Sequence, residues 1–343
     1  MTSDGGKFQV GSDHLVDEVV PTLGWQLDKR ISFNWRDRFI SHQKTDEIHA
    51  LIDRLRARPR TLRPQGLLVA SVPGNGKTAL LQEYARRFAP HKNPEHADQD
   101  NETARLLLTA TPGNGKTALL QEYAFRHPNY STPETSIKPV VIALAPVHGG
   151  AGKLYSAILK ALGYKDWDQG SIDSKQRRLL NALVNCRVEL VVIDDVNNWL
   201  HGGTSKSEAL YAIRNISNCL QIPLVFAGSE EARIVFEEED SIKTRLDIVE
   251  LPLWSEGHEY YDFLFNLEST LSLKNASYLW KEEKSHLIMS LSGVLDPYGR
   301  RGIIYNILKL VKTATESGLQ DGSECIEASH LKAAAEKQRS QWA

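Results

Sequence analysis

The chain has 343 residues, of which 41% are hydrophobic and 24% charged, and its formal net charge is -2. This composition argues against disorder, and so small a charge excludes a general attraction to nucleic acid, so any DNA binding needs a local basic patch. Three widely spaced cysteines and the lack of a long apolar run argue against a disulfide framework, a zinc cluster, a signal peptide and a membrane span. We therefore expect a cytoplasmic protein with one large and one smaller domain.

Residues 1–57 are expected to form an N-terminal arm that ends in one helix. Residues 1–40 show no clear periodicity and carry several aromatic side chains, which suggests an irregular arm with aromatic anchors. From Thr45 onward, apolar residues recur at helical spacing until Pro59 ends the pattern. The apolar positions of this predicted helix are Ile48, Leu51, Ile52 and Leu55.

Residues 58–254 alternate short apolar runs with helical segments, which predicts an α/β core. The predicted strands are GLLVAS (66–71), RLLLTA (105–110), KPVVIALAPV (138–147), VELVVIDD (188–195) and IPLVFAGS (222–229). Strands this apolar are typical of a doubly wound parallel sheet that helices cover on both faces. After residue 254 the strands stop, and four helical segments in 255–343 predict a small all-α lid domain.

The segment PGNGKT occurs twice, because residues 73–85 and 112–124 are identical. In each copy a predicted strand leads into the segment and an amphipathic helix follows. In such a P-loop the backbone N–H groups wrap phosphates, the lysine reaches the β and γ oxygens, and the hydroxyl binds Mg²⁺, so ATP and Mg²⁺ are the predicted cofactors. The predicted nucleotide-binding residues are Gly74, Asn75, Gly76, Lys77 and Thr78 in the first copy and Gly113, Asn114, Gly115, Lys116 and Thr117 in the second, with Thr78 and Thr117 also as metal ligands.

Two acids end the strand at 188–195. Asp194 is predicted to hold Mg²⁺ beside the loop threonine, and Asp195 to orient or deprotonate the attacking water. Most such ATPases have glutamate at the second position, and aspartate is one methylene shorter, so we expect slow hydrolysis or a site that binds better than it cleaves. Ser229, after the next strand, is a candidate sensor of the γ-phosphate, although a serine there can equally be a helix N-cap.

A basic stretch at residues 54–63 is the candidate DNA contact. Its arginines are Arg54, Arg56, Arg58, Arg60 and Arg63. They could neutralise DNA phosphates and give sequence-independent, salt-sensitive binding. The alternative is a solvated helix end whose cations complement the helix dipole. No recognition-helix motif is visible, so base-specific readout is not expected.

Taken together, these motifs resemble the AAA+ ATPases of DNA transposons, of the TniB/TnsC type, over residues 30–335. The segments that carry the resemblance are RPRTLRPQGLLVAS, FRHP, KPVVIALAP, VVIDDVNNWL, IPLVFAGSEEA, TRLDIVELPLW and SGVLDPYGRRG. The resemblance implies an ATP-dependent regulator that assembles on double-stranded target DNA, as a ring or helical filament, and recruits and activates a DDE transposase. It also implies that Arg245 is an arginine finger that reaches the γ-phosphate bound by a neighbouring subunit. A replication-initiator or helicase-loader ATPase, or a signalling nucleotide switch, would share the same core.

The repeated segment leaves open how it arose and which copy works. Removing 39 residues within the shared stretch restores one continuous family-like pattern, as expected after an in-frame duplication, although an artefact of sequence assembly would leave the same trace. There is one acidic strand, and one strand can fill the place beside it, so we expect a single working site. The short connection from the second copy to the strand at 138–147 gives an ordinary βαβ crossover, which favours the second copy.

Overall fold

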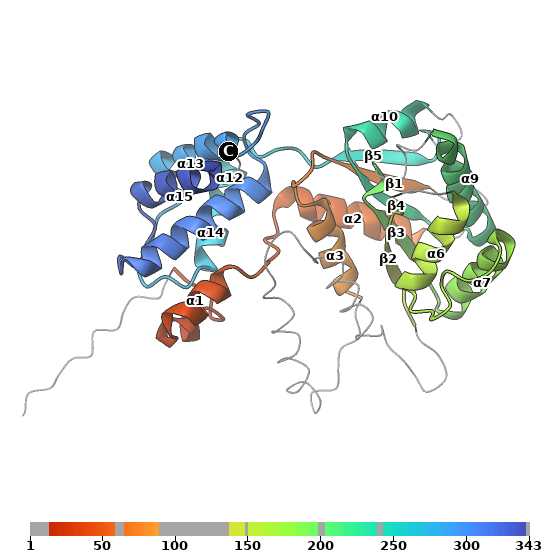
Figure 1. Cartoon of the computed structure of the whole chain (residues 1–343), viewed down its shortest axis with the longest axis horizontal. Helices are drawn as coiled ribbons and strands as arrows, with labels where there is room; N and C mark the ends of the chain where they lie inside the picture. The colour runs from red at the N-terminus through yellow and green to blue at the C-terminus, as the bar shows by residue number, and fades with distance from the viewer. Residues whose placement is uncertain are drawn as a thin grey trace, which may run out of the picture. The chain divides into compact units, whose positions relative to one another are not determined.

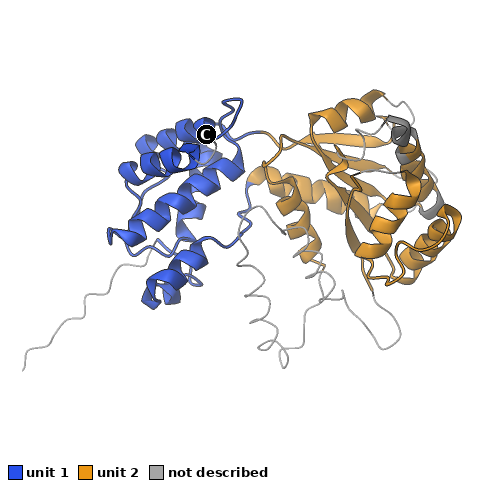
Figure 2. Ribbon diagram, viewed as in Figure 1, with its two compact units in different colours: residues 1–42, 253–343 blue, residues 43–252 orange. Residues whose placement is uncertain are grey.

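The computed structural model (Figure 1) describes the residues of six ranges, namely 14–58, 65–88, 137–147, 150–197, 203–238 and 243–340. The chain divides into two compact units, which Figure 2 colours separately. The larger unit comprises residues 43–252, and the smaller one residues 1–42 and 253–343. Within the described ranges, none of the helices has the length and apolar character needed to cross a membrane.

The larger unit is built on a five-stranded parallel sheet with the order β2-β3-β4-β1-β5 (Figure 1). Its strands are β1 (Gly66–Ala70), β2 (Val140–Leu144), β3 (Leu190–Asp194), β4 (Leu224–Gly228) and β5 (Leu246–Glu250). Every residue of β1, β3 and β4 is buried, which explains why these strands are uniformly apolar runs. The predicted parallel α/β sheet is confirmed.

Helices pack on both faces of this sheet (Figure 1). One face carries α2 (Gln43–Ala57) and α3 (Lys77–Arg86), and the other carries α6 (Ala151–Ala161), α7 (Ile172–Asn185) and α9 (Gly203–Leu220). A further helix, α10 (Glu230–Glu238), follows β4. Leu68 of β1 belongs to a core cluster with Leu154 of α6 and Leu179 of α7, whereas the helix residues Leu80 and Tyr84 of α3 are fully buried outside that cluster. This is the doubly wound arrangement.

The strand order corrects two expectations. β4 lies between β1 and β3, so the strand that leads into the P-loop is not the neighbour of the acidic strand. The strand in the sheet is residues 66–70 of the first copy, so the preference for the second copy in this position is wrong. That preference gave too much weight to the short connection of the second copy. The entropic cost of closing a connection grows only with the logarithm of its length, so a long connection is tolerated. The second copy, 105–128, lies outside the described residues.

Deleting residues 86–124 is expected to leave the fold intact. The deletion joins Ala85 to Phe125, keeps one complete strand, loop and helix, and removes 39 residues from the connection between α3 and β2. Shortening the connection to about a quarter of its length lowers its closure entropy, so we expect the free energy of unfolding to rise by roughly 1 kcal/mol. Urea denaturation measures this. Loss of a cooperative transition would instead mean that the second copy is part of the core.

The smaller unit is helical, as predicted for the C-terminal lid. Its elements are a 3₁₀ helix η1 (Val20–Gly24), α1 (Leu27–Asn34), α12 (His258–Ser269), α13 (Glu282–Val294), α14 (Ile304–Gln320) and α15 (Ala328–Ser340). The N-terminal arm is not irregular in its described part, because it contains η1 and α1, and it belongs to this unit. The helix at 43–57 belongs to the larger unit.

Glu324→Ala is expected to destabilise the smaller unit by about 3 kcal/mol, because it leaves a buried cation without its carboxylate. Arg30 is 4% exposed, and its two terminal nitrogens donate to the Glu324 carboxylate at 2.7 and 2.5 Å. Arg30 also donates to Ser272 O at 2.7 Å. Replacing both charges, in Arg30→Met with Glu324→Leu, should recover most of the loss. Urea denaturation compares the variants, and a loss below about 1 kcal/mol in the single variant would contradict the prediction.

Candidate nucleotide-binding site

The loop between β1 and α3 has the backbone shape of a phosphate cradle. Gly74 and Gly76 have φ of +77° and +84°, a left-handed conformation that favours glycine. α3 begins at Lys77, directly after Gly76, so the first N–H groups of the helix face the loop. These N–H groups have no acceptor within the helix, and together with the helix dipole they attract an anion.

Lys77 is buried within this loop, with 7% of its surface exposed. Its Nζ donates to Ser71 O at 2.8 Å and to Val72 O at 3.0 Å. Burial lowers the pKa of this ammonium, and the negative charges of Asp194 and Asp195 oppose the shift. The lysine is therefore held on the loop by neutral carbonyls, and the charged oxygens of a phosphate are stronger acceptors than these.

Asp194 joins the loop from β3, across the intervening strand. It is 4% exposed, and its carboxylate accepts the Asp195 N–H at 2.9 Å and the Thr78 hydroxyl. Burial raises the pKa of this carboxyl, against the hydrogen bond from Thr78, which lowers it. Carboxylate and hydroxyl oxygens are ligands that Mg²⁺ takes in proteins, so the Asp194 and Thr78 pair fits a magnesium nucleotide.

Asp195 has φ of +54°, a left-handed conformation that is uncommon for residues other than glycine. Its N–H donates back to Asp194 Oδ1, which fixes the turn at the end of β3. Strained backbone of this kind is concentrated at functional sites. Because of this conformation, the chain leaves the direction of β3 at Asp195, at the carboxyl edge of the sheet.

Ser229 follows β4 at the same edge and is 6% exposed. Its hydroxyl donates to Glu231 Oε2 at 2.7 Å, and its backbone N–H donates to Asn197 Oδ1 at 2.5 Å. Asn197, two residues after Asp195, thus connects the ends of β3 and β4. A Cβ at Gly228 would come within 3.0 Å of Asn197 Oδ1, so this close approach needs glycine. Sequence reasoning missed Asn197, although its place behind the acid pair was a usable signal.

The side-chain amide of Asn75 forms hydrogen bonds within the chain, one of them to Ser71, whose backbone carbonyl also binds Lys77. The residue is 3% exposed, and its Nδ2 donates to Ser71 Oγ at 2.8 Å and to two backbone carbonyls at residues 251 and 252. The side-chain amide is thus engaged within the chain, at Ser71 and at residues 251 and 252. This structural role was not visible in the sequence, because the carbonyl partners lie far along the chain.

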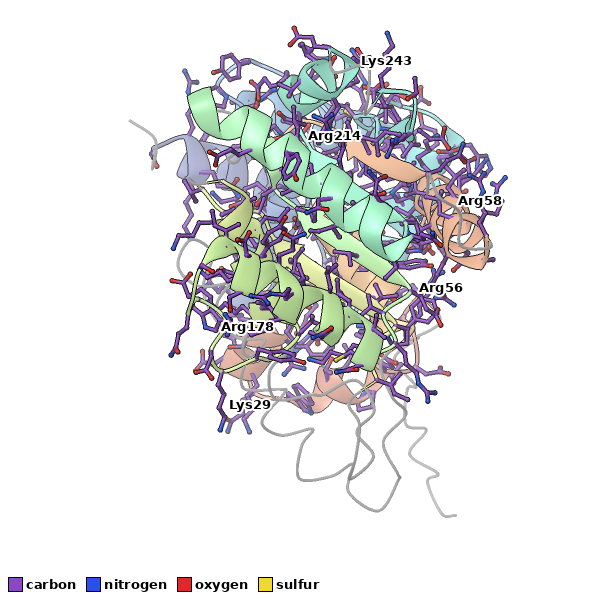
Figure 3. All side chains as sticks on the ribbon, turned by 90° about the vertical axis from the view of Figure 1, so that its right-hand side faces the viewer. Lys29, Arg56, Arg58, Arg178, Arg214 and Lys243 are labelled. Atoms are coloured by element: carbon purple, nitrogen blue, oxygen red, sulfur yellow. The ribbon has the colours of Figure 1, made fainter. Side chains whose placement is uncertain are left out.

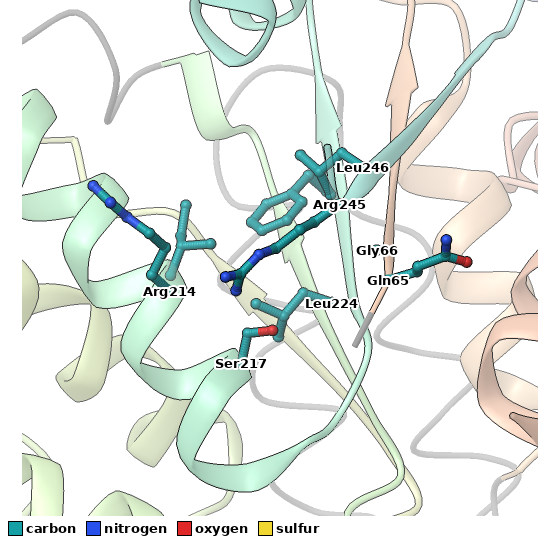
Figure 4. A pocket seen from close by; sticks show the side chains of 9 residues that line it. Gln65, Gly66, Arg214, Ser217, Leu224, Arg245 and Leu246 are labelled. Carbon is teal, nitrogen blue, oxygen red and sulfur yellow. The ribbon is translucent and has the colours of Figure 1, made fainter. Parts of the chain in front are cut away.

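Arg245 lies at the opposite, amino edge of the sheet, immediately before β5. Its Nη1 donates to Asn218 Oδ1 of α9 at 2.7 Å, and Figure 4 shows its side chain directed towards Ser217. It lines a pocket with residues that include Gln65, Arg214 and Leu224. Five strand residues separate this edge from the loop by about 16 Å, more than an arginine side chain spans. Arg245 therefore cannot reach the P-loop of its own chain.

The described arginines of this stretch differ in their contacts, and Figure 3 labels two of them, Arg56 and Arg58. Arg56 pairs with Glu189 at 3.1 Å and stacks on the Phe88 ring at 3.7 Å, so it is engaged in packing. Arg54 and Arg58 are exposed at the end of α2. The remaining predicted site residues, Arg60, Arg63, Gly113, Asn114, Gly115, Lys116 and Thr117, lie outside the described residues.

The structure has the architecture of the AAA+ class of P-loop proteins. The P-loop strand lies between β4 and β5, an acid ends β3, and the chain has a separate helical unit. The family described as "Bacterial TniB protein" matches residues 30–112 and 95–256, which together exceed half of the chain. The chain therefore belongs to the TniB family, as its motifs predicted. Each of the two matches contains one copy of the P-loop, in agreement with a duplicated segment. Among curated proteins, none matches the chain.

Several solved structures share the fold. Cdc6p from Pyrobaculum aerophilum has a TM-score of 0.57 and 15% identity, over 90% of this chain and 70% of its own. The Aeropyrum pernix ORC1 protein, in complex with DNA, has a TM-score of 0.54 and 16% identity, over 90% of this chain and 69% of its own. The ORC2 protein of the same organism, solved as ADPNP-ADP complexes, has a TM-score of 0.54 and 15% identity, over 90% of this chain and 71% of its own. At these identities the likeness shows the AAA+ fold.

Proposed function

We propose that the chain is an ATPase with one working site, built on the first copy of the P-loop. The observation that carries this proposal is the meeting of Lys77, Thr78 and Asp194, although β4 separates their strands. An ammonium, a hydroxyl and a carboxylate in this arrangement suit a magnesium nucleotide. The ORC2 protein, which has the same fold, was solved as ADPNP-ADP complexes, and this supports an adenine nucleotide.

In the proposed reaction, the chain binds the triphosphate and orients the attacking water. Lys77 would transfer its hydrogen bonds from Ser71 O to the phosphate oxygens. Asp195 would orient the water or accept its proton, and Ser229 Oγ would donate to the γ-phosphate instead of to Glu231. Thr78 and Asp194 would hold Mg²⁺, which when bound neutralises charge on the phosphates.

Asp195→Glu is expected to raise the rate of ATP hydrolysis by about tenfold, because the longer carboxylate reaches further towards the attacking water. Asp195→Ala should lower the rate by about 100-fold, the usual contribution of a general base. ATP affinity should change little in both variants, since Lys77 and the loop are intact. The exposed Asp247 of β5 provides the matched control in Asp247→Glu. Phosphate release measures the rates, and an unchanged rate in Asp195→Ala would contradict the assigned role.

We further propose that the ATPase regulates DNA transposition, by assembling on double-stranded DNA and activating a DDE transposase. Membership of the TniB family is the main support. The exposed Arg54 and Arg58 offer phosphate contacts, and the ORC1 structure of the same fold is a complex with DNA. Arg245 cannot reach the P-loop of its own chain, so it would act at the P-loop of a neighbouring subunit. This supports head-to-tail assembly, which gives a ring or an open filament.

Electron microscopy with duplex DNA, with and without a non-hydrolysable ATP analogue, tests this function. We expect analogue-dependent rings or filaments on DNA, and capture of a DDE transposase. Capture of a replicative helicase in place of a transposase would support the replication-initiator alternative. Absence of any assembly on DNA, in a preparation that binds the analogue, would reject DNA regulation while leaving the ATPase assignment intact.

A further inference from the structure

Asn75, in the middle of the P-loop, is bound to the segment in which the larger unit ends. Its Nδ2 donates to Leu251 O and to Pro252 O, both at 2.9 Å, as well as to Ser71 Oγ at 2.8 Å. Pro252 is the last residue of the larger unit, and the chain enters the helical unit at Leu253. One side-chain amide therefore links the loop to the start of this connection.

The backbone fixes the contact from both sides. Leu251 N donates to Ala70 O at 2.9 Å, which continues the pairing of β5 with β1 and keeps residues 251–252 beside the loop. Gly74 and Gly76 flank Asn75 in left-handed conformations, so the shape of the loop sets the direction of the Asn75 side chain. The amide has two N–H hydrogens for three acceptors, so a shift of the loop changes which acceptors it satisfies.

We propose that Asn75 is a positioning residue that couples nucleotide bound at the P-loop to residues 251–252. This inference rests on the proposed ATP site. Phosphate oxygens would draw the Lys77 ammonium away from Ser71 O, which changes the contacts of Ser71. The hydroxyl of the same serine accepts a hydrogen bond from Asn75. Asn75 passes the change to the carbonyls of Leu251 and Pro252. Nucleotide occupancy is thereby transmitted to the chain segment that leads into the helical unit.

Hydrogen exchange on the full-length chain, with and without AMP-PNP and Mg²⁺, tests the coupling. In the wild type, AMP-PNP should slow the exchange of peptides covering residues 249–258 by about tenfold, as expected for a locally stabilised segment. In Asn75→Ala this difference should fall below about twofold. Each variant is supplied with AMP-PNP at a concentration that saturates it, as set by titration, so that the exchange differences are compared at equal occupancy.

Asn75→Asp is the second variant, and it keeps the side-chain volume. Its carboxylate cannot donate to the two carbonyls and should abolish the exchange difference as alanine does. Asn275→Ala removes an exposed asparagine that bonds to Ser323 O in the helical unit, and it should behave as wild type.

The possible failures are distinguishable. A wild type that binds no AMP-PNP would overturn the ATP site itself. A wild type that binds it without any change at 249–258 would overturn the coupling alone, as would an Asn75→Ala variant that keeps the full change. Parallel loss of affinity and of the exchange difference in both Asn75 variants would mean that Asn75 only shapes the loop, and this also overturns the coupling.

Discussion

Replacing Lys77 with alanine is expected to lower ATP affinity by about 100-fold, whereas Lys116→Ala should leave it within about threefold. The reason is the sheet, because the strand between β4 and β5 is residues 66–70, and its loop presents Lys77 to Asp194 and Asp195. The charge-assisted bonds of one lysine with phosphate account for about 3 kcal/mol. Titration of each variant with a fluorescent ATP analogue measures the difference.

The matched control for this experiment is Lys138→Ala. Lys138 is also a buried lysine held by a backbone carbonyl, with its Nζ donating to Leu162 O at 2.8 Å, but it lies away from the loop. Its loss should lower stability and leave ATP affinity unchanged. Equal losses of affinity in Lys77→Ala and Lys116→Ala would defeat the single-site proposal. A loss confined to Lys116→Ala would assign the site to the second copy.

The central strands could be predicted from the sequence because burial on both faces leaves a continuous apolar signature. β1, β3 and β4 are fully buried, and each lies within its predicted run. β5 was missed because it is an edge strand with exposed Asp247 and Ile248 and a terminal Glu250, so its sequence has no such signature. The order of the strands was also not predictable, since spacing along the chain does not show that β4 lies between β1 and β3.

The candidate site shows the same division between local and non-local information. The P-loop and Asp194 carry local patterns, and the structure brings them together. Asn75, Asn197 and Asn218 act through hydrogen bonds to residues 27 to 177 positions away, and no local pattern marks such pairs. The two copies of the P-loop are identical from residue 73 to 85, so only the flanking segments could distinguish them. Their tertiary fit decides which strand enters the sheet.

Arg245→Ala is expected to lower ATP hydrolysis in the assembled state by about 1,000-fold, the lower end of the contribution of an arginine finger. ATP affinity should change little, because the pocket of Arg245 is at the amino edge of the sheet, across from Lys77. Removing the bond to Asn218 should also cost little stability, because the pair is exposed. Arg233→Ala, which removes an exposed arginine of α10, is the matched control and should hydrolyse ATP normally.

Mixing variants separates action on a neighbour from action within the chain. Arg245→Ala retains a nucleotide site, and Lys77→Ala retains the finger, so each is inactive alone for a different reason. In head-to-tail assemblies of both, a Lys77→Ala subunit can complete the site of an Arg245→Ala neighbour, and random mixing should restore up to about one quarter of the wild-type rate. Activity that stays absent in mixed assemblies would show that Arg245 does not act on a neighbouring site. Full activity of Arg245→Ala alone would remove it from the reaction altogether.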